Sequence, residues 1–406
     1  MSKNIKSNWV NIKIRDYVDI VRGYAFKTSD YESKGHPIVR VTNISSLSQL
    51  NLTENLVYLS TKREDEFNSI LLRDDDFLMV MVGATIGKHA KVITKGQKLF
   101  LNQNMWCLRV KQPEYNSQKF VFYALQKVID NFLATMQGSA RNFFTQSEFE
   151  KATIELPPLP EQKKIAEILS AIDDEISSNI DKKFKCESVG KALINNFLKN
   201  VFSDGSNARV APLGSVTEIK GRIGWKGYTK EDLVDSGALV IGGTQITSSN
   251  EIDLSKPVYI SDYKYEESPE IMVNNGDLIL VKTGNTIGKI ALVPDWNRRA
   301  TINPNTIILR ANNGLNRYLL LLLSSEIYQK KLWDMVAVGA QPSVNQKNLK
   351  ALEIPLIDSE KIKSLCDNFD LISNVAKLYG KRIALLTHLK QGVAADLFSG
   401  RKRVNI

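Results

Sequence analysis

The sequence predicts an α+β protein built from two tandem copies of one unit, each a globular domain followed by a long helix. Three observations in the 406-residue chain support this prediction. A motif recurs in both halves, short strand-forming runs occur in both halves, and each half ends in a long amphipathic stretch. No βαβ alternation indicates a doubly wound sheet.

The internal repeat is the strongest of these signals. Residues 76–88 return at 277–289 with Gly-x-Thr-Ile-Gly-Lys in both copies. At the same offset, Asn102-Gln-Asn matches Asn303-Pro-Asn, and Leu108-Arg109 matches Leu309-Arg310. Several matches in one register predict that the two halves share a fold.

Within the globular domains, β-branched and aliphatic runs bounded by Gly, Asn and Asp predict strands at 37–41, 77–82, 278–281 and 306–309. Helices are expected near 118–136 and 315–335.

The two long helices are predicted by apolar residues that recur at the helical period from 161 to 202 and from 362 to 398. Prolines 157, 158 and 160 precede the first helix, Asp358 or Ser359 caps the second, and Gly205 and Gly400 follow the two ends. Each stripe is too long for one small domain to cover, so antiparallel packing of the two helices is expected. The predicted coiled-coil and partner-interface residues are Ile165, Leu169, Ile172, Ile176, Ile180, Phe184, Phe369, Ile372, Ile383, Leu386 and Leu389.

Composition excludes several classes of protein. The longest apolar run, 318–323, is too short to cross a bilayer, and no apolar segment follows the N-terminal residues as a secretory signal would require. Three scattered cysteines and three histidines form no zinc or disulfide pattern, so we expect a cytoplasmic protein without a metal site. The net charge of +10 is compatible with nucleic-acid binding but does not establish it.

Two motifs imitate catalytic sites. The loop at 83–89 lacks the spacing and the Ser or Thr of a phosphate-binding loop, so a tight turn between strands is expected. Glu161-Gln-Lys163 has a nuclease-like spacing, but its place in the first turn of a helix favours an interaction with the helix dipole. No catalytic residue is predicted.

Residues 156–169, Leu-Pro-Pro-Leu-Pro-Glu-Gln-Lys-Lys-Ile-Ala-Glu-Ile-Leu, together with the repeated glycine loop, resemble the specificity subunit of type I restriction-modification systems. The resemblance implies target recognition domains at 1–155 and 204–357. It assigns a central coiled-coil helix to 156–203 and a distal helix with a basic tail to 358–406. The second copy lacks the Glu-Gln pair at its helix start.

The resemblance further implies a non-catalytic subunit that binds double-stranded DNA, with each domain reading half of a bipartite target. The coiled coil would set the spacing and dock two adenine-methylating modification subunits, and through them restriction subunits. S-adenosylmethionine, ATP and Mg²⁺ would be bound by those partners, and this chain would bind no cofactor. The alternative is a coiled-coil scaffold whose end domains bind protein or another ligand.

Candidate DNA-binding residues lie in loops that combine cations, aromatic side chains, amides and glycines, which suit phosphates and base edges. Ordinary surface turns remain the alternative for these loops. The candidates are Arg22, Tyr24, Lys27, Arg40, Asn43, Lys88, Arg141, Asn142, Lys220, Arg222, Trp225, Lys226, Tyr228, Thr244, Gln245, Lys289, Gln341, Ser343 and Asn345.

The repeat divides these candidates into two kinds. Residues shared by both copies, such as Lys88 and Lys289, cannot distinguish two half-sites and are expected to be structural or to contact phosphates. Positions that differ, such as Arg141 against Pro342, are better candidates for base reading. We therefore expect Arg141→Ala to affect one half-site only and Lys88→Ala to weaken binding uniformly.

Overall fold

The computed structural model describes residues 8–45, 48–136, 145–203, 209–222, 227–311, 314–337 and 342–405. The chain forms two compact units: unit 1 comprises Met1–Asn179 with Arg382–Ile406, and unit 2 comprises Ile180–Lys381. Each unit contains one globular part and half of each long helix. The compact units therefore cut across the linear division predicted from the sequence.

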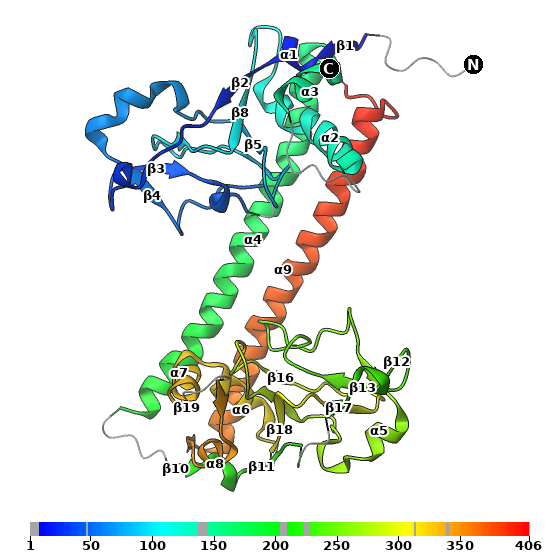
Figure 1. Ribbon diagram of the computed structural model, residues 1–406. Helices are drawn as coiled ribbons and strands as arrows, with labels where there is room; N and C mark the ends of the chain where they lie inside the picture. The colour runs from blue at the N-terminus through cyan, green and yellow to red at the C-terminus, as the bar shows by residue number, and fades with distance from the viewer. Residues whose placement is uncertain are drawn as a thin grey trace. The chain divides into compact units, whose positions relative to one another are not determined.

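Unit 1 is built on a four-stranded sheet of order β2-β8-β5-β6, with a smaller sheet β4-β3-β7 and a two-stranded sheet β1-β9. In Figure 1, α2 and α3 lie on the side of the long helices, and β3 and β4 lie away from them. The bounds are β1 Val10–Lys13, α1 Ile14–Tyr17, β2 Val18–Arg22, β3 His36–Val39, β4 Val57–Leu59, β5 Phe77–Val80, β6 His89–Lys91, β7 Phe100–Leu101, β8 Met105–Val110, α2 Gln118–Met136, α3 Gln146–Lys151 and β9 Thr153–Leu156.

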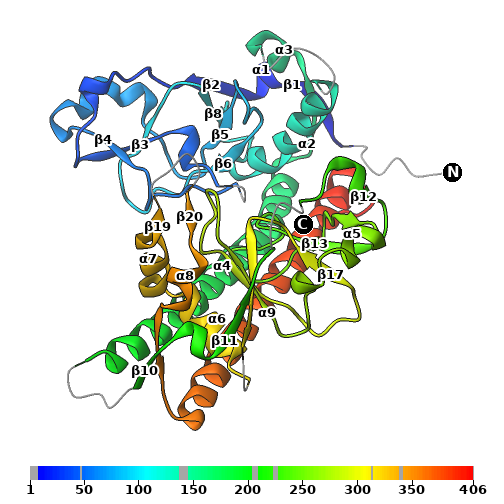
Figure 2. The same ribbon diagram turned by 60° about the horizontal axis from the view of Figure 1, so that its bottom comes forward.

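Unit 2 repeats this plan with sheets β11-β18-β15-β16, β12-β14-β13-β17, β10-β21 and β19-β20. Figure 2 shows α6, α7 and α8 on one side of this unit and β13 and β17 on the other. The bounds are β10 Arg209–Pro212, β11 Thr217–Lys220, β12 Leu233–Val234, β13 Ala238–Ile241, β14 Tyr259–Ile260, α5 Asp262–Glu266, β15 Leu278–Val281, β16 Ile290–Leu292, β17 Ala300–Ile302, β18 Thr306–Ala311, α6 Asn316–Ser324, α7 Glu326–Asp334, β19 Val336–Ala337, β20 Ser343–Val344, α8 Gln346–Lys350 and β21 Glu353–Leu356.

Both faces of each main sheet are buried. Alternate side chains of a strand point to opposite faces, so one strand contributes to two cores. In β5, Phe77 and Met79 pack with α2, whereas Leu78 and Val80 pack with the smaller sheet. β15 is divided in the same way between two cores. The α+β class and the internal repeat predicted from the sequence are confirmed.

The long helices are α4, Leu159–Val201, and α9, Ser359–Ser399, and they run antiparallel within each unit. In unit 1, Arg382 Nη2 lies 2.7 Å from Glu175 Oε1, and Lys390 Nζ lies 2.7 Å from Asp173 Oδ1. In unit 2, α4 approaches α9 so closely that a Cβ on Gly190 would lie 3.2 Å from the Phe369 ring. Gly190 therefore allows α4 and α9 to approach closely at this position.

Most of the predicted coiled-coil residues are buried or half-buried. Ile165, Leu169 and Ile176 are at most 6% exposed. The half-buried members are Ile172, Ile180, Phe369, Ile372, Ile383 and Leu386.

Phe184 and Leu389 are exceptions, since they are 69% and 53% exposed. Helices that wind around each other keep their contact line at 3.5 residues per turn, so a stripe extrapolated at 3.6 drifts off that line. The adjacent residues are half-buried instead: Lys183 next to Phe184, and Lys390 next to Leu389. The prediction that Phe184 and Leu389 lie in the contact between α4 and α9 is therefore wrong.

The predicted helix at 315–335 is two helices. Ser325 ends α6 and caps α7, with its hydroxyl accepting a hydrogen bond from the Tyr328 amide. A serine hydroxyl can replace a backbone acceptor at such a break, which the apolar pattern alone does not reveal.

Candidate nucleic-acid interface

Several loops of unit 1 meet at one edge of the main sheet. Arg22 at the end of β2 pairs with Trp106, and Val80 at the end of β5 pairs with Met105, so both strands end beside the start of β8. The Tyr24 amide donates to the Leu101 carbonyl at 3.0 Å, which brings the end of the smaller sheet to the same place.

The neighbouring turns join this edge from the smaller sheet. β3 and β7 run parallel, and the Asn102 amide donates to the Val39 carbonyl at 3.0 Å. The loop after β3 and the Asn102-Gln-Asn turn therefore lie side by side. In unit 2, the Asn303 amide donates to the Ile241 carbonyl at 2.9 Å and repeats this junction.

The repeated glycine loops are tight turns between strands, as predicted. They connect β5 to β6 and β15 to β16. Gly83 and Gly87 have φ angles of +90° and +80°, and Gly284 and Gly288 have +97° and +89°. Glycine adopts these left-handed angles without strain, which explains its spacing in both copies.

Three candidates of unit 1 are exposed at or near this edge. The Arg22 Nε donates to Gln146 Oε1 at 3.0 Å, and Lys27 is exposed. Tyr24 is 45% exposed and packs edge-on against Phe26 at 5.0 Å between ring centroids. A cation and an aromatic face are thus available together beside the sheet edge.

The geometry argues against a base-reading role for Asn43 and Gln245. Asn43 is 1% exposed, and its side-chain oxygen accepts the Arg40 amide at 2.9 Å. Gln245 is 8% exposed and accepts the Gly242 amide at 3.0 Å in the same turn of the other copy. These amides hold the loop after β3 or β13 and are not presented to a ligand.

The neighbours of these residues differ in availability. Arg40 is half-buried, and its Nη2 donates to the Asn55 carbonyl at 2.5 Å. Thr244 is exposed, although its hydroxyl donates to Gln245 Oε1 at 3.0 Å. Arg40 therefore supports a neighbouring loop, whereas Thr244 stays at the surface.

The cations of unit 2 are more engaged with other groups. Lys220 Nζ lies 3.0 Å from Glu218 Oε2. Burial lowers the pKa of Arg222 below its usual value, partly offset by nearby acidic groups. Tyr228 accepts a hydrogen bond from Asn303 Nδ2 at 2.9 Å, which ties it to the turn after β17.

The two shared lysines are placed differently. Lys289 Nζ donates to the Ile246 carbonyl at 3.2 Å, so this amine supports the adjacent loop. Lys88 is half-buried, and in the described part of the chain its amine makes no hydrogen bond. The structure thus gives Lys289 the structural role expected of a shared residue and leaves Lys88 able to contact a phosphate.

Ser343 and Asn345 lie close to the glycine loop of unit 2. Ser343 Oγ is 3.3 Å from Thr283 Oγ1, and the Gly284 amide donates to the Pro342 carbonyl at 3.0 Å. The Asn345 side chain accepts the Lys347 amide at 2.8 Å and caps α8. Asn345 therefore has a capping role that the sequence analysis did not assign.

Five candidates lie outside the described residues: Arg141, Asn142, Trp225, Lys226 and Gln341. The base-reading prediction for Arg141 stays a prediction.

The Glu161-Gln162 pair is buried, with each side chain 1% exposed. Both Glu161 oxygens bind Arg403, at 2.7 and 2.8 Å, and the Trp9 indole donates to Oε2 at 3.1 Å. The sequence predicts only an interaction of Glu161 with the helix dipole. Its main partners, Trp9 and Arg403, come from segments far away in the sequence.

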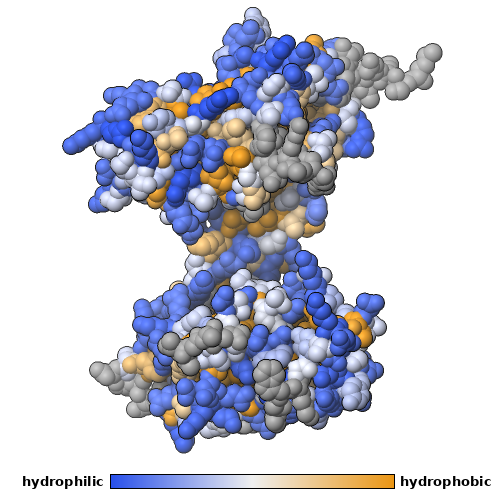
Figure 3. All heavy atoms as spheres, in the orientation of Figure 1, coloured by the Kyte–Doolittle hydropathy of each residue, from blue (hydrophilic) through white to orange (hydrophobic). Residues whose placement is uncertain are grey.

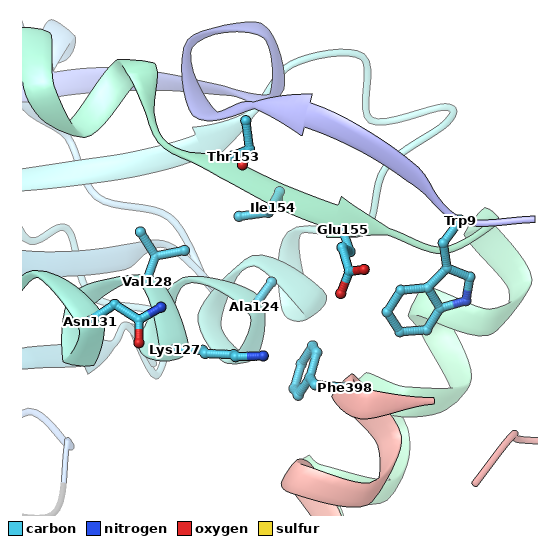
Figure 4. Close-up of a pocket in the computed structure, with 9 residues that line it drawn as sticks. All are labelled: Trp9, Ala124, Lys127, Val128, Asn131, Thr153, Ile154, Glu155 and Phe398. Carbon is cyan, nitrogen blue, oxygen red and sulfur yellow. The ribbon is translucent and has the colours of Figure 1, made fainter. Parts of the chain in front are cut away.

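A shallow pocket in unit 1 does not qualify as a small-molecule site. Trp9, Glu155, Lys127 and Phe398 are among the residues lining it (Figure 4). Its volume of about 180 Å³ is below the roughly 300–1,000 Å³ of typical ligand pockets. The sheet edge remains the candidate site.

Among the described residues, no group of three or more His, Cys, Asp or Glu side chains could hold a metal ion. No helix in the described ranges is long and apolar enough to cross a membrane.

The model of the type I restriction modification DNA specificity domain matches this chain twice, at residues 6–185 and 207–377. The chain belongs to this family. It is therefore a type I specificity subunit, and its two matches correspond to the two copies of the internal repeat.

Similar proteins agree with this assignment over nearly the whole chain. The MjaVIII specificity subunit of Methanocaldococcus jannaschii is 22% identical, covering 98% of this chain and 94% of the relative. The EcoBI specificity subunit of Escherichia coli is also 22% identical, with 98% and 87% covered.

Two solved structures share the fold. The S subunit of the type I system of M. genitalium has a TM-score of 0.58 at 15% identity, covering 100% of this chain and 99% of that one. A chain from a study of complex assembly and conformational transition of the type I R-M system has a TM-score of 0.55 at 17% identity, with 97% and 98% covered.

The side chains at the tips of the glycine loops are not among the candidates predicted from the sequence. Val82 is 40% exposed, and Ala84 and Asn285 are exposed. The signal was present in the repeat, because positions 84 and 285 differ inside an otherwise shared motif.

Proposed function

We propose that this specificity subunit binds a bipartite DNA target, with each globular part contacting one half. The supporting observation is that, among the described residues, both units place the glycine loop and the turn at Asn102 or Asn303 at the same edge of the main sheet. Exposed side chains at that edge differ between the copies, as two different half-sites would require.

The chemistry of this edge suits DNA. Arg22 and Lys27 can neutralise phosphates, and exposed hydroxyl and amide groups of unit 2 can pair with base edges. Hydrophilic side chains dominate the visible faces of both globular parts (Figure 3). This surface favours a polar ligand over an apolar one.

We further propose that α4 and α9 set the distance between half-sites and dock two modification subunits. Leu371, Leu378 and Leu385 follow each other at seven-residue intervals on α9 and are 63–70% exposed. That interval places them on one helix face, which is suited to another helix. An exposed apolar row of this kind is a typical feature of a protein contact.

In this proposal the chain is not itself an enzyme. The modification subunits bind S-adenosylmethionine and methylate adenine, and the restriction subunits that join through them use ATP and Mg²⁺.

Binding to duplex DNA at several salt concentrations tests the DNA-binding part of the proposal. The complex of this chain with its modification subunits should bind one bipartite sequence. For each phosphate contact, the logarithm of the association constant should fall by about 0.9 for a tenfold rise in salt concentration. Salt-independent or absent binding would favour the protein-binding scaffold.

Docking is tested with Leu371→Glu and Leu378→Glu, compared with Ala384→Glu on the same helix. The leucine variants should reduce co-purification of the modification subunit at least about tenfold, because they place charge in an apolar contact. Ala384 is exposed but lies about a third of a turn around the helix from the leucine row, so its variant should bind normally. Equal binding by all three variants would exclude this face of α9.

A further inference from the structure

The two glycine loops provide the same backbone scaffold. Val80 donates to the Lys88 carbonyl at 2.8 Å, and Val281 donates to the Lys289 carbonyl at 2.8 Å. The amides of Lys88 and Lys289 close both turns on Thr85 and Thr286, at 3.1 and 3.2 Å. Position 84 of one copy is therefore equivalent in backbone placement to position 285 of the other.

The base of each loop is held by a helix. A Cβ on Gly87 would lie 2.7 Å from the Leu133 side chain of α2, so loop and helix are in close contact. In unit 2, Gln329 Nε2 of α7 donates to the Gly288 carbonyl at 2.9 Å. A side chain at the tip is thus carried on a supported turn.

The side chains at the two tips are exposed. Among the described residues, a Cβ on Gly83 or on Gly284 would meet no atom within 4 Å. Ala84 and Asn285 are both exposed, and within the described ranges the Asn285 amide makes no hydrogen bond. The side chain at this position is available to an external ligand.

Asn285 is not required to form the turn. Asparagine is common in turns because its side chain can bond to the backbone. Here Ala84 occupies the same backbone position without an amide, and the Asn285 amide makes no such bond. The difference between the copies therefore affects what the loop presents, and the turn itself is unchanged.

We propose that this tip position determines one base pair in each half-site. The inference rests on the proposed DNA-binding function. Asn285 donates to and accepts from the N7 and N6 positions of an adenine in the major groove, and the Ala84 methyl contacts the methyl group of a thymine. The shared Thr85 and Thr286 serve both loops alike and carry no preference.

The test is selection from a library of random-sequence DNA duplexes by the full chain in complex with its modification subunits. Asn285→Ala should reduce the preference for adenine at one position of one half-site about tenfold, with the other half-site and the spacing unchanged. Ala84→Asn should create an adenine preference in the opposite half-site. Thr286→Ala, the matched control in the same loop, should leave the selected sequence unchanged.

The outcomes separate the two proposals. If the unmodified complex selects no bipartite sequence, the DNA-binding function itself fails. If it selects one and both tip variants select the same one, the tip assignment is overturned. Loss of affinity for all sequences without a change in preference, at an unchanged melting temperature, would also overturn it.

Discussion

Arg109 and Arg310 make the same contacts in the two copies. Arg109 holds the 2%-exposed Asp76 through two bonds of 2.8 and 2.6 Å, and Arg310 holds Asp277 through bonds of 2.8 and 2.7 Å. These hydrogen bonds raise the pKa of both guanidinium groups. Residues that the repeat preserves in both halves thus include a buried ion pair of the sheet.

We expect Arg109→Ala to lower the free energy of unfolding by about 3–5 kcal/mol, because it leaves a buried carboxylate without its cation. Urea denaturation measures the change. The double variant Arg109→Leu with Asp76→Leu should recover most of the loss. A cost below about 1 kcal/mol for the single variant would indicate a surface-type ion pair instead.

His89 predicts a pH dependence for unit 1. Its ring packs against Phe77 and Phe122, with centroids at 5.6 and 5.8 Å, and Nδ1 is 2.9 Å from the Gly87 carbonyl. Burial lowers the pKa of His89 below its usual value of about 6.5. His89 is therefore protonated more easily in the unfolded chain than in the folded one. The free energy of unfolding of unit 1 falls as the pH drops through and below the usual histidine pKa of about 6.5.

Urea denaturation between pH 7.5 and 5.5 tests this expectation. The free energy of unfolding should fall toward low pH with a contribution from His89 of at most about 1.4 kcal/mol per pH unit. His89→Gln should remove that contribution and flatten the curve. An unchanged slope in this variant would show that other groups cause the dependence.

Among the elements, the long helices are the best predicted and the most informative in their errors. α9 begins after its Asp358 cap and ends before Gly400, as predicted, because such signals act on neighbouring backbone groups. Pro160, predicted to precede the first helix, is the second residue of α4, and Gly205 lies outside the described residues. The side chains in the contact line depend on supercoiling, which is decided by the partner helix. Lys390 illustrates this, since it binds Asp173 where the pattern favoured Leu389.

Asn179 is a polar residue buried in α4, with 1% exposure. Its amide nitrogen donates to the Glu175 carbonyl at 2.6 Å, but its side-chain oxygen has no hydrogen-bond partner among the described residues. A polar residue at such a position fixes helix register at a cost in stability.

Asn179→Leu should therefore stabilise unit 1 by about 1 kcal/mol and raise its melting temperature, because no buried oxygen is left unsatisfied. Asn179→Asp should have the opposite effect, since it would bury a charge. Differential scanning calorimetry measures both. A Leu variant that melts below the unmodified chain would show that the amide is needed for packing.

At the scale of the whole molecule, distant parts of the chain meet at Glu161. Trp9 lies near the start of the chain, Arg403 near its end, and Glu161 at the start of α4. The network of Trp9, Glu161 and Arg403 thus joins the segments before β1 and after α9 to the first turn of α4 in unit 1.

We expect Arg403→Ala to destabilise unit 1 by about 3 kcal/mol, because the buried Glu161 loses its cation. Hydrogen exchange should show lower protection in β1, β9 and the first turns of α4, with no change in β15 and β18. Arg401→Ala is the matched control, since Arg401 is exposed and pairs only locally, with Asp396. Equal loss of protection in both units would contradict a local role.

The sequence alone determined the repeat, the two long helices, the tight glycine turns and the family, because these follow from local spacing and short motifs. Only the tertiary structure decided that Asn43 and Gln245 are buried, that Phe184 and Leu389 face outward, and that Glu161 binds Arg403. Each of these depends on residues that are distant in sequence, and burial is a property of the neighbours that folding supplies. The role of the glycine-loop tip was inferred from both. The repeat revealed that Ala84 and Asn285 differ, and the structure showed that both side chains are exposed.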